Sequence, residues 1–216
     1  AAHVPGVGIP LAEPHECYVL IDLTGPGVDD DGDAGGALKE TLESILAGAL
    51  EDGVIADAVI AASESQAAAL WQIREAVPEA QHTAGASIKH DISVPVSRVP
   101  EFLKRATETV EAEMPGIRVM AFGHLGDGNI HFNLSQPEGM DPAAYLAEWG
   151  RFNRIVHDIV DGLGGSFSAE HGIGVLKKQE LEKYKSGVEL DLMRLIKRTL
   201  DPKGIMNPGK VVTGSG

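Results

Sequence analysis

The stretch FGHLGDGNIHFNL, residues 122–134, contains two short segments suited to β-strands on either side of an Asp-Gly dipeptide. Asp-Gly is a preferred dipeptide for a two-residue type I′ hairpin loop. With Asp127 and Gly128 as that loop, the pairing register sets His124 directly opposite His131. Opposed residues of an antiparallel pair have Cβ atoms about 4.5–5.5 Å apart on one face of the sheet. The sequence therefore predicts a hairpin on which two imidazoles can meet one metal ion.

Alternation along the hairpin adds a third polar side chain to this face. Because successive side chains of a strand point to opposite faces, Asn133 shares the face of the two histidines, and so does Phe122. The alternative interpretation is a hairpin with two ordinary histidines that hydrogen-bond within the sheet. Two histidines opposed across a tight turn, with Asn133 beside them, favour a metal or catalytic site.

A third metal ligand is expected from the glycine-rich segment GGSFSAEHGIG, residues 164–174. Its Glu170 supplies a carboxylate, and two histidines with one carboxylate and open coordination positions suit a catalytic zinc or another divalent ion. The adjacent His171 is a candidate general base, because imidazoles exchange protons near neutral pH. Taken alone, the same segment also suits a strand-to-helix turn with a Glu-His pair on the surface.

Two cations are candidates for binding an anionic substrate. Arg74 lies one helical turn after Leu70 and Trp71, at the edge of an apolar stripe, where a guanidinium can hold a carboxylate with two hydrogen bonds. Lys89 lies on the polar face of a predicted strand, beside Asp91. The alternative interpretations are a surface arginine whose stem covers apolar surface and a lysine on an edge strand.

The rest of the chain alternates predicted strands and helices. Hydrophobic patterns predict strands at 17–23, 54–62, 87–94, 117–124, 129–135 and 165–169. They predict helices at 36–51, from Ser63 to before Pro78, and at 98–113, 141–163, 175–184 and 188–200. This order indicates an α+β domain in which helices cover a largely antiparallel sheet, and it is too irregular to favour a doubly wound parallel sheet.

Composition excludes several classes of protein. The 216 residues carry a formal net charge of −14, which argues against nucleic acid as a partner. Cys17 is the single cysteine, so no disulfide can form within the chain, and no apolar run reaches the ~18 residues of a candidate membrane span. The sequence has no G-x-G-x-x-G, and the run from Gly204 to Lys210 lacks the Ser or Thr that completes a phosphate-binding loop. A nucleotide-binding fold within this chain is therefore not expected.

Several of these motifs resemble one known family. GHLGDGNIHFN (123–133), GGSFSAEHGIG (164–174) and the tail DPKGIMNPGK (201–210) resemble the C-terminal domain of FAD-linked oxidases. That family includes D-lactate dehydrogenases, the FAD subunit of glycolate oxidase and D-2-hydroxyglutarate dehydrogenases. The segment from Leu70-Trp71 to IKHDISVP (88–95) is also similar to this family, and most similar to its hydroxyglutarate branch. The resemblance spans nearly the whole chain.

The resemblance implies an α+β domain whose antiparallel sheet caps a flavin held by a preceding domain. His124, His131 and Glu170 match the family's divalent-metal ligands, with zinc as the usual ion of the hydroxyglutarate branch. The remaining matches are Arg74, Lys89 and Asn133 at substrate-binding positions, His171 at the catalytic base and Asn207 where the tail approaches the flavin.

The function that the resemblance implies is the oxidation of a D-2-hydroxy acid, such as D-2-hydroxyglutarate, D-lactate or D-malate, by hydride transfer to FAD. Residues 1–216 would be the substrate- and metal-binding C-terminal domain of a longer flavoenzyme, inactive by itself because the N-terminal FAD-binding domain is absent from this chain. The implied partners are the hydroxy acid and an electron acceptor such as an electron-transfer flavoprotein, a quinone or a cytochrome, with a homodimer as an option. The expected localisation is cytoplasmic, with peripheral membrane association through the acceptor as an option.

One position departs from the family pattern. Four residues after Arg74 the hydroxyglutarate branch can carry a substrate-binding threonine, whereas this chain has Pro78, which cannot donate a hydrogen bond. The identity of the acid therefore stays open. The alternatives are a non-catalytic metal-binding or interaction module of the same fold and a flavin oxidase that acts on another alcohol.

Overall fold

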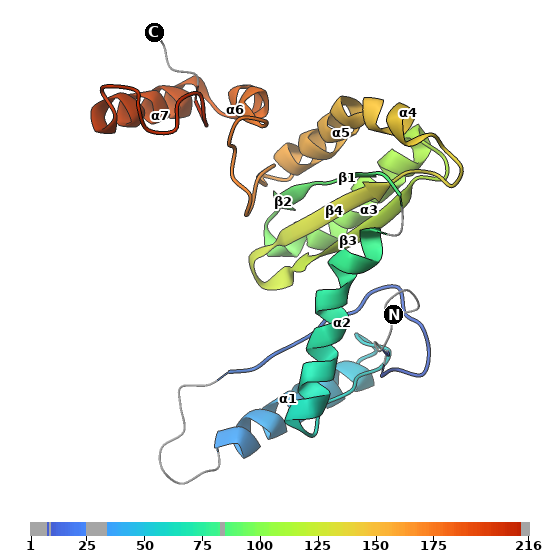
Figure 1. Cartoon of the computed structure of the whole chain (residues 1–216). Helices are drawn as coiled ribbons and strands as arrows, with labels where there is room; N and C mark the ends of the chain where they lie inside the picture. The colour runs from blue at the N-terminus through green and yellow to red at the C-terminus, as the bar shows by residue number, and fades with distance from the viewer. Residues whose placement is uncertain (1–7, 9, 25–33, 83–84, 213–216) are drawn as a thin grey trace. The chain divides into compact units, whose positions relative to one another are not determined.

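A computed structural model gives the fold of the chain (Figure 1). It describes residues 8, 10–24, 34–82 and 85–212. The chain divides into two compact units, Ala1–Thr83 and Ala84–Gly216, and each is described by itself. The expectation of one domain over residues 1–216 stays a prediction. Within the described residues, no helix combines the length and apolar character that crossing a membrane requires.

The first unit contains two helices, α1 (Ala34–Glu51) and α2 (Glu64–His82). The predicted helix at 36–51 is confirmed. The predicted start of α2 is also confirmed, because the Ser63 hydroxyl accepts a hydrogen bond from the backbone N–H of Gln66. Its predicted end is wrong, since the helix continues past Pro78 to His82. Proline removes one helical hydrogen bond, but its fixed φ is helical, so the backbone can continue.

Two predicted strands of the first unit are wrong. Residues 17–23 and 54–62 form no strand in the described part of the chain. The side chains of Tyr18, Val19 and Ile21 are 51%, 65% and 48% exposed. A run of β-branched and aromatic residues becomes a strand only where a neighbour accepts and donates its ladder hydrogen bonds, and these two segments have no strand pairing among the described residues.

The second unit is built on an antiparallel sheet with β4 (Asn129–Ser135) at its centre. Its neighbours are β3 (Arg118–His124) on one side and β1 (Ser87–Ile88) with β2 (Asp91–Ser93) on the other. The pairs of β1 and β2 with β4 share one register, so residues 87–93 run beside β4 as one interrupted strand. The predicted strands at 87–94, 117–124 and 129–135 and the predicted α+β class are confirmed.

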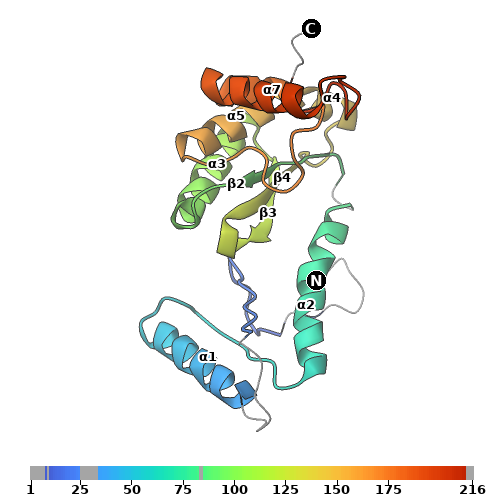
Figure 2. The same ribbon diagram turned by 90° about the vertical axis from the view of Figure 1, so that its left-hand side faces the viewer.

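Helices cover one face of this sheet and form the core. In Figure 2, α3 (Val99–Glu113) and α5 (Trp149–Gly162) lie side by side on the same side of the strands. Alternation along β4 turns Ile130, Phe132 and Leu134 into this core. Other fully buried members include Ile92, Phe102, Val110, Phe152 and Val156. Each such side chain contributes about 1.5–3 kcal/mol relative to exposure, so the helix-facing side of the sheet carries most of the stability.

The remaining helices follow the predicted order with small changes. The predicted helix at 141–163 divides at Glu148 into α4 (Pro142–Ala147) and α5, and the Asp141 carboxylate accepts a hydrogen bond from the N–H of Ala144. The last two helices are α6 (Lys178–Tyr184) and α7 (Gly187–Leu200). The predicted strand at 165–169 is reduced to one antiparallel bridge between Ser93 and Ser166.

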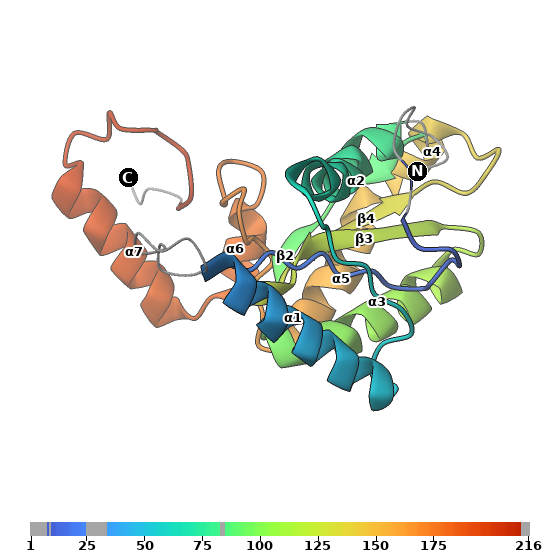
Figure 3. The ribbon, with the colours of Figure 1, turned by 90° about the horizontal axis from the view of Figure 1, so that it is seen from below.

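The hairpin differs from its prediction in the length of its turn. Leu125–Asp127 form a 3₁₀ turn, and Gly128 follows with a left-handed φ of 72°, so four residues connect β3 and β4. The two strands lie side by side in Figure 3. His124 pairs with Asn129 and Phe122 pairs with His131. The predicted pairing of His124 with His131 is therefore wrong by two residues. An even shift keeps every side chain on its predicted face.

Gly128 provides a test of this turn. Its φ is left-handed, and a Cβ at this position would collide with the backbone carbonyl oxygen of Val94. Gly128→Ala is expected to lower the free energy of unfolding by at least about 2 kcal/mol, measured by denaturant unfolding. The matched control is Gly126→Ala, whose Cβ would meet none of the described atoms within 4 Å. Equal unfolding midpoints for the two variants would contradict the turn geometry.

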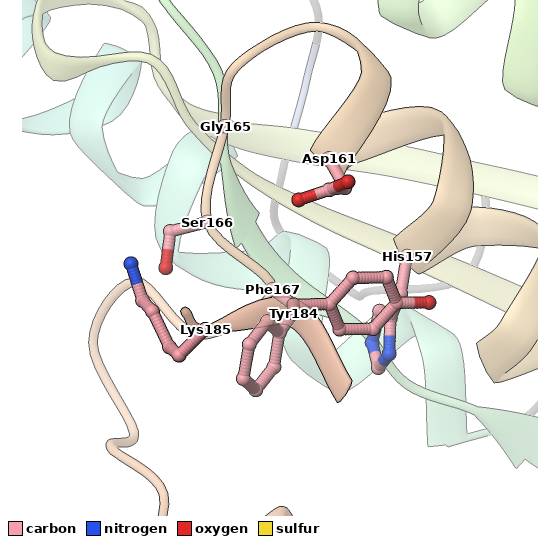
Figure 4. A pocket seen from close by; sticks show the side chains of 7 residues that line it. All are labelled: His157, Asp161, Gly165, Ser166, Phe167, Tyr184 and Lys185. Atoms are coloured by element: carbon pink, nitrogen blue, oxygen red, sulfur yellow. The ribbon is translucent and has the colours of Figure 1, made fainter. Parts of the chain in front are cut away.

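Two histidines are buried on the core side of the sheet. His90 is 2% exposed, and its Nδ1 lies 2.7 Å from the carbonyl oxygen of Phe132. Its ring lies 5.8 Å from that of His157, which packs against Phe167 and Tyr184 (Figure 4). Burial lowers the pKa of His90 from 6.5 to about 3, so the folded protein keeps this imidazole neutral.

This burial predicts how stability depends on pH. Between about pH 6.5 and 3 the unfolded chain protonates His90 and the folded chain does not, so the free energy of unfolding decreases as the pH falls through this range. One such proton contributes a slope of about 1.4 kcal/mol per pH unit. His90→Gln is expected to reduce the slope of unfolding free energy against pH by this amount. Parallel curves for the variant and the wild type would show that His90 does not titrate in this way.

Candidate metal and substrate site

The face of the sheet opposite the helices carries a row of side chains across three strands, two of them polar and one aromatic. Asp91 on β2 and Phe122 on β3 both pair with His131 on β4. Paired residues share one face of a sheet. The rings of Phe122 and His131 are in contact, with centroids 5.0 Å apart. The site is therefore built on the strand residues whose side chains point away from the core, and these alternate along each strand with the residues that point into it.

The predicted metal ligands come together at one end of this face. His131 Nε2 lies 3.4 Å from Glu170 Oε2, and His124 Nε2 lies 3.8 Å from Glu170 Oε1. Two ligands held about 2.0–2.1 Å from one tetrahedral zinc lie about 3.4 Å apart. Imidazole and carboxylate are also ligand types that zinc prefers. The chemistry of these three donors and the distance of each imidazole from the Glu170 carboxylate suit a divalent ion.

His171 is a fourth donor at the same place. One ligand atom each from His131, Glu170 and His171 lie within 4.8 Å of one another, and the rings of the two histidines are 5.9 Å apart. Glu170 and His131 belong both to the predicted set and to this one. Among the described residues, His171 and not His124 completes the set of three whose ligand atoms all lie within 4.8 Å of one another. The structure thus brings the three predicted ligands and the predicted base into one cluster, without assigning a role to each.

Backbone pairing with β2 brings the Glu170 segment to the sheet. Ser93 and Ser166 exchange two backbone hydrogen bonds of 2.9 and 2.8 Å, and the N–H of Ala169 donates to the carbonyl oxygen of Asp91 at 3.3 Å. Residues 166–169 therefore run along the outer side of β2, and the next two residues are Glu170 and His171.

Asp91 joins this segment to the sheet through its side chain. Its Oδ2 accepts hydrogen bonds from the backbone N–H groups of Glu170 (2.9 Å) and His171 (2.8 Å), and its Oδ1 accepts one from Asn129 Nδ2 (2.9 Å). Burial would raise the pKa of Asp91, but the hydrogen bonds from His171, Glu170 and Asn129 outweigh it and lower this pKa. Asp91 is therefore a carboxylate in the folded protein at neutral pH.

Sequence reasoning did not assign a role to Asp91 or Asn129. It placed Asp91 on the polar face of its strand, and the structure confirms that placement. The signal that would have identified Asp91 is an acid on a strand position that faces the predicted metal ligands. Its partners at positions 129, 170 and 171 are distant along the chain, so no local pattern predicts the contacts.

Lys177 supports the same segment from another direction. Its Nζ donates hydrogen bonds to the carbonyl oxygen of Phe167 and to the hydroxyl of Ser168, both at 3.2 Å. Burial lowers the pKa of Lys177, and the nearby Asp91 carboxylate opposes this shift. The sequence around Lys177 has no motif that indicates this role.

The predicted substrate-binding residues are placed in different parts of the molecule. Lys89 is exposed between β1 and β2, and the common register of these strands sets it opposite Asn133, which is 4% exposed. Both therefore share the polar face with His131. Arg74 lies on α2 in the first unit, and Asn207 is an exposed residue with a φ of 47° after α7. The substrate-binding roles of Arg74, Lys89 and Asn133 and the flavin contact of Asn207 all stay predictions.

Taken together, the second unit is an α+β domain that gathers imidazoles, a carboxylate and a lysine on one sheet face, which suits the binding of a metal ion and an anion. The family model for FAD linked oxidases, C-terminal domain, matches residues 2–211. The chain belongs to this family.

Curated relatives extend the similarity over most of the chain. It is 38% identical over 219 residues to a mitochondrial D-2-hydroxyglutarate dehydrogenase of Arabidopsis thaliana, covering 99% of this chain and 35% of the relative. It is 40% identical over 163 residues to a D-2-hydroxyglutarate dehydrogenase of Stutzerimonas stutzeri, covering 75% and 35%. It is 36% identical over 217 residues to a putative mitochondrial D-lactate dehydrogenase of Schizosaccharomyces pombe, covering 96% and 39%. The chain thus spans little more than a third of these relatives' lengths.

Proposed function

We propose that this chain is the substrate- and metal-binding part of an FAD-dependent dehydrogenase that oxidises a D-2-hydroxy acid to the 2-oxo acid. The observation that carries the proposal is the position of Glu170, whose Oε2 lies 3.4 Å from His131 Nε2 and whose Oε1 lies 3.8 Å from His124 Nε2. Similarity to relatives named D-2-hydroxyglutarate dehydrogenase and D-lactate dehydrogenase supports the choice of substrate class.

In this proposal His124, His131 and Glu170 hold a divalent ion, with zinc as the first choice. A bound divalent ion would supply Lewis acidity, which lowers the pKa of a coordinated hydroxyl group. The three side chains come from two strands and a segment paired with a third strand. A site held by sheet hydrogen bonds keeps its donors in place before the substrate arrives.

His171 is the proposed base that takes the proton from the substrate hydroxyl. Its Nδ1 lies 3.5 Å from Asp91 Oδ2. An imidazole that directs Nδ1–H toward a carboxylate has Nε2 as its proton acceptor. The exposed side chain of His171 stands beside His131, so the acceptor would be close to the hydroxyl group of a substrate bound at this site.

Lys89 and Asn133 are proposed to bind the carboxylate next to the reacting carbon, because they share the polar face with His131. Arg74 is proposed to bind a second carboxylate, as in D-2-hydroxyglutarate or D-malate. Pro78 occupies the position where the hydroxyglutarate branch can have a hydrogen-bonding threonine. D-Lactate, which has no second carboxylate, therefore stays among the candidate substrates.

The flavin is proposed to bind mainly to a part of the enzyme outside these 216 residues. The described sheet is antiparallel, whereas dinucleotide-binding folds use parallel strands with a Gly-rich turn. FAD would supply the acceptor for the hydride that leaves the substrate. Asn207 is the proposed contact of this chain with the flavin. An electron-transfer flavoprotein, a quinone or a cytochrome is the proposed final acceptor.

The metal site gives the first test of this proposal. The protein from the complete reading frame is expected to bind one zinc ion per chain, measured by elemental analysis and chelator competition. His131→Ala and Glu170→Ala remove donors common to both possible ligand sets, and each should weaken zinc binding by at least about 100-fold, since loss of outer-shell partners alone costs 10–100-fold. Wild-type protein without bound metal at neutral pH would contradict the proposal.

The substrate gives the second test. D-2-Hydroxyglutarate, D-lactate and D-malate would each be added to the complete flavoprotein, and flavin bleaching and reduction of an artificial acceptor would be recorded. Lys89→Met should raise KM for the preferred acid about 10- to 100-fold, because a hydrogen bond to a charged group contributes about 1.5–3 kcal/mol. Lys104→Met, at an exposed position on α3, is the control and should leave KM unchanged.

Two outcomes would favour another function. Bound zinc without flavin reduction by any of these acids would indicate a non-catalytic metal-binding module. Flavin reduction by an alcohol that lacks a 2-carboxylate would indicate an oxidase with a different substrate.

A further inference from the structure

Asp91 is a buried carboxylate that is hydrogen-bonded to two segments distant from it in the sequence. It is 3% exposed, and its two oxygens accept three hydrogen bonds. Two of the donors are the consecutive backbone N–H groups of Glu170 and His171, which converge on the single atom Oδ2. The proposed metal ligand and the proposed base are therefore attached to the sheet by the same oxygen atom.

The register of the sheet adds a second link. Asp91 pairs with His131 across β2 and β4, so the residue that holds Glu170 also lies directly opposite the histidine that Glu170 faces. The distance of 3.4 Å between His131 Nε2 and Glu170 Oε2 therefore depends on where Asp91 holds the backbone of Glu170. Among the described residues, Asp91 Oδ2 is the acceptor for the backbone N–H of Glu170.

Asn129 connects Asp91 to the strand position opposite His124, the third predicted ligand. Its Nδ2 donates to Asp91 Oδ1 at 2.9 Å and to the carbonyl oxygen of Ile92 at 3.2 Å. It is 2% exposed and pairs with His124 across β3 and β4. Asn129 therefore orients the Asp91 carboxylate from the strand position opposite His124.

We propose that Asp91, oriented by Asn129, is the positioning residue that sets Glu170 and His171 relative to His131. The inference rests on the proposed function, because it assigns Asp91 an effect on the metal site and on the base. An uncharged amide cannot replace it. Asn has one acceptor oxygen, so its NH₂ group would face either the Asn129 amide donor or the two backbone N–H groups, and donors would oppose donors.

The test compares Asp91→Asn with wild type in the complete flavoprotein. Zinc affinity is measured by chelator competition, and the coordination geometry is read from the visible absorption of the Co²⁺-substituted protein. Asp91→Asn should weaken zinc binding about 10- to 100-fold, as loss of outer-shell partners does, change the Co²⁺ spectrum and lower kcat at least about 10-fold. KM should change less than about threefold, because Lys89 and Asn133 are untouched. Asp161→Asn, an exposed carboxylate on α5, is the matched control and should behave as wild type.

A second variant covers the case in which Asp91→Asn does not fold. Asn129→Ser shortens one side chain and removes the hydrogen bond to Asp91 Oδ1, so it should shift zinc affinity and kcat in the same direction by a smaller factor. Thermal unfolding of each variant shows whether the protein is still folded. A folded variant with weaker zinc binding has lost the correct placement of Glu170 and His171.

The outcomes distinguish this inference from the proposed function. A wild-type protein that binds neither zinc nor Co²⁺ would overturn the proposed function itself. Wild-type metal binding, together with an unchanged Co²⁺ spectrum, zinc affinity and kcat in folded Asp91→Asn, would overturn the positioning role alone. If only Asn129→Ser folds, unchanged values for that variant would overturn it. A lower unfolding temperature without a spectral change would show that Asp91 is purely structural.

Discussion

The antiparallel register of β4 with its neighbours is the constraint on which the rest of the second unit depends. One set of alternate residues, Ile130, Phe132 and Leu134, is buried against the helices. The other set places His131 and Asn133 on the opposite face, across from Asp91 and Lys89. A slip of one residue would exchange the two sets, so the burial of apolar side chains on one face also holds the polar site in place on the other.

Much of this arrangement could be predicted from local sequence. The alternation of residues 87–94 and 129–135 identified the core and polar faces correctly, and the predicted helix start at residue 141 agrees with Asp141 as the N-cap of α4. The hairpin prediction failed in its turn, because Leu125–Asp127 form a 3₁₀ turn before Gly128 and make the connection four residues long. The two histidines still share a face, since the register moved by an even number of residues.

Other features depend on contacts that local sequence does not record. The segments 17–23 and 54–62 have the composition of strands but no pairing in the described chain, and edge pairing is decided by tertiary structure. In the sequence Asp91 cannot be told apart from any other polar strand residue. Only the folded structure shows that it accepts hydrogen bonds from the backbone of Glu170 and His171. Arg74 lies in the first unit, so its relation to the proposed site follows from the family resemblance and not from geometry.

The central claim is that Glu170 and the hairpin histidines bind one divalent ion for the oxidation of a 2-hydroxy acid. Anomalous diffraction at the zinc absorption edge, from crystals of the zinc-loaded complete flavoprotein, tests it most directly. We expect one strong peak within coordination distance of Glu170 and His131, with a third ligand from His124 or His171. A zinc peak bound elsewhere, with no density between Glu170 and His131, would contradict it.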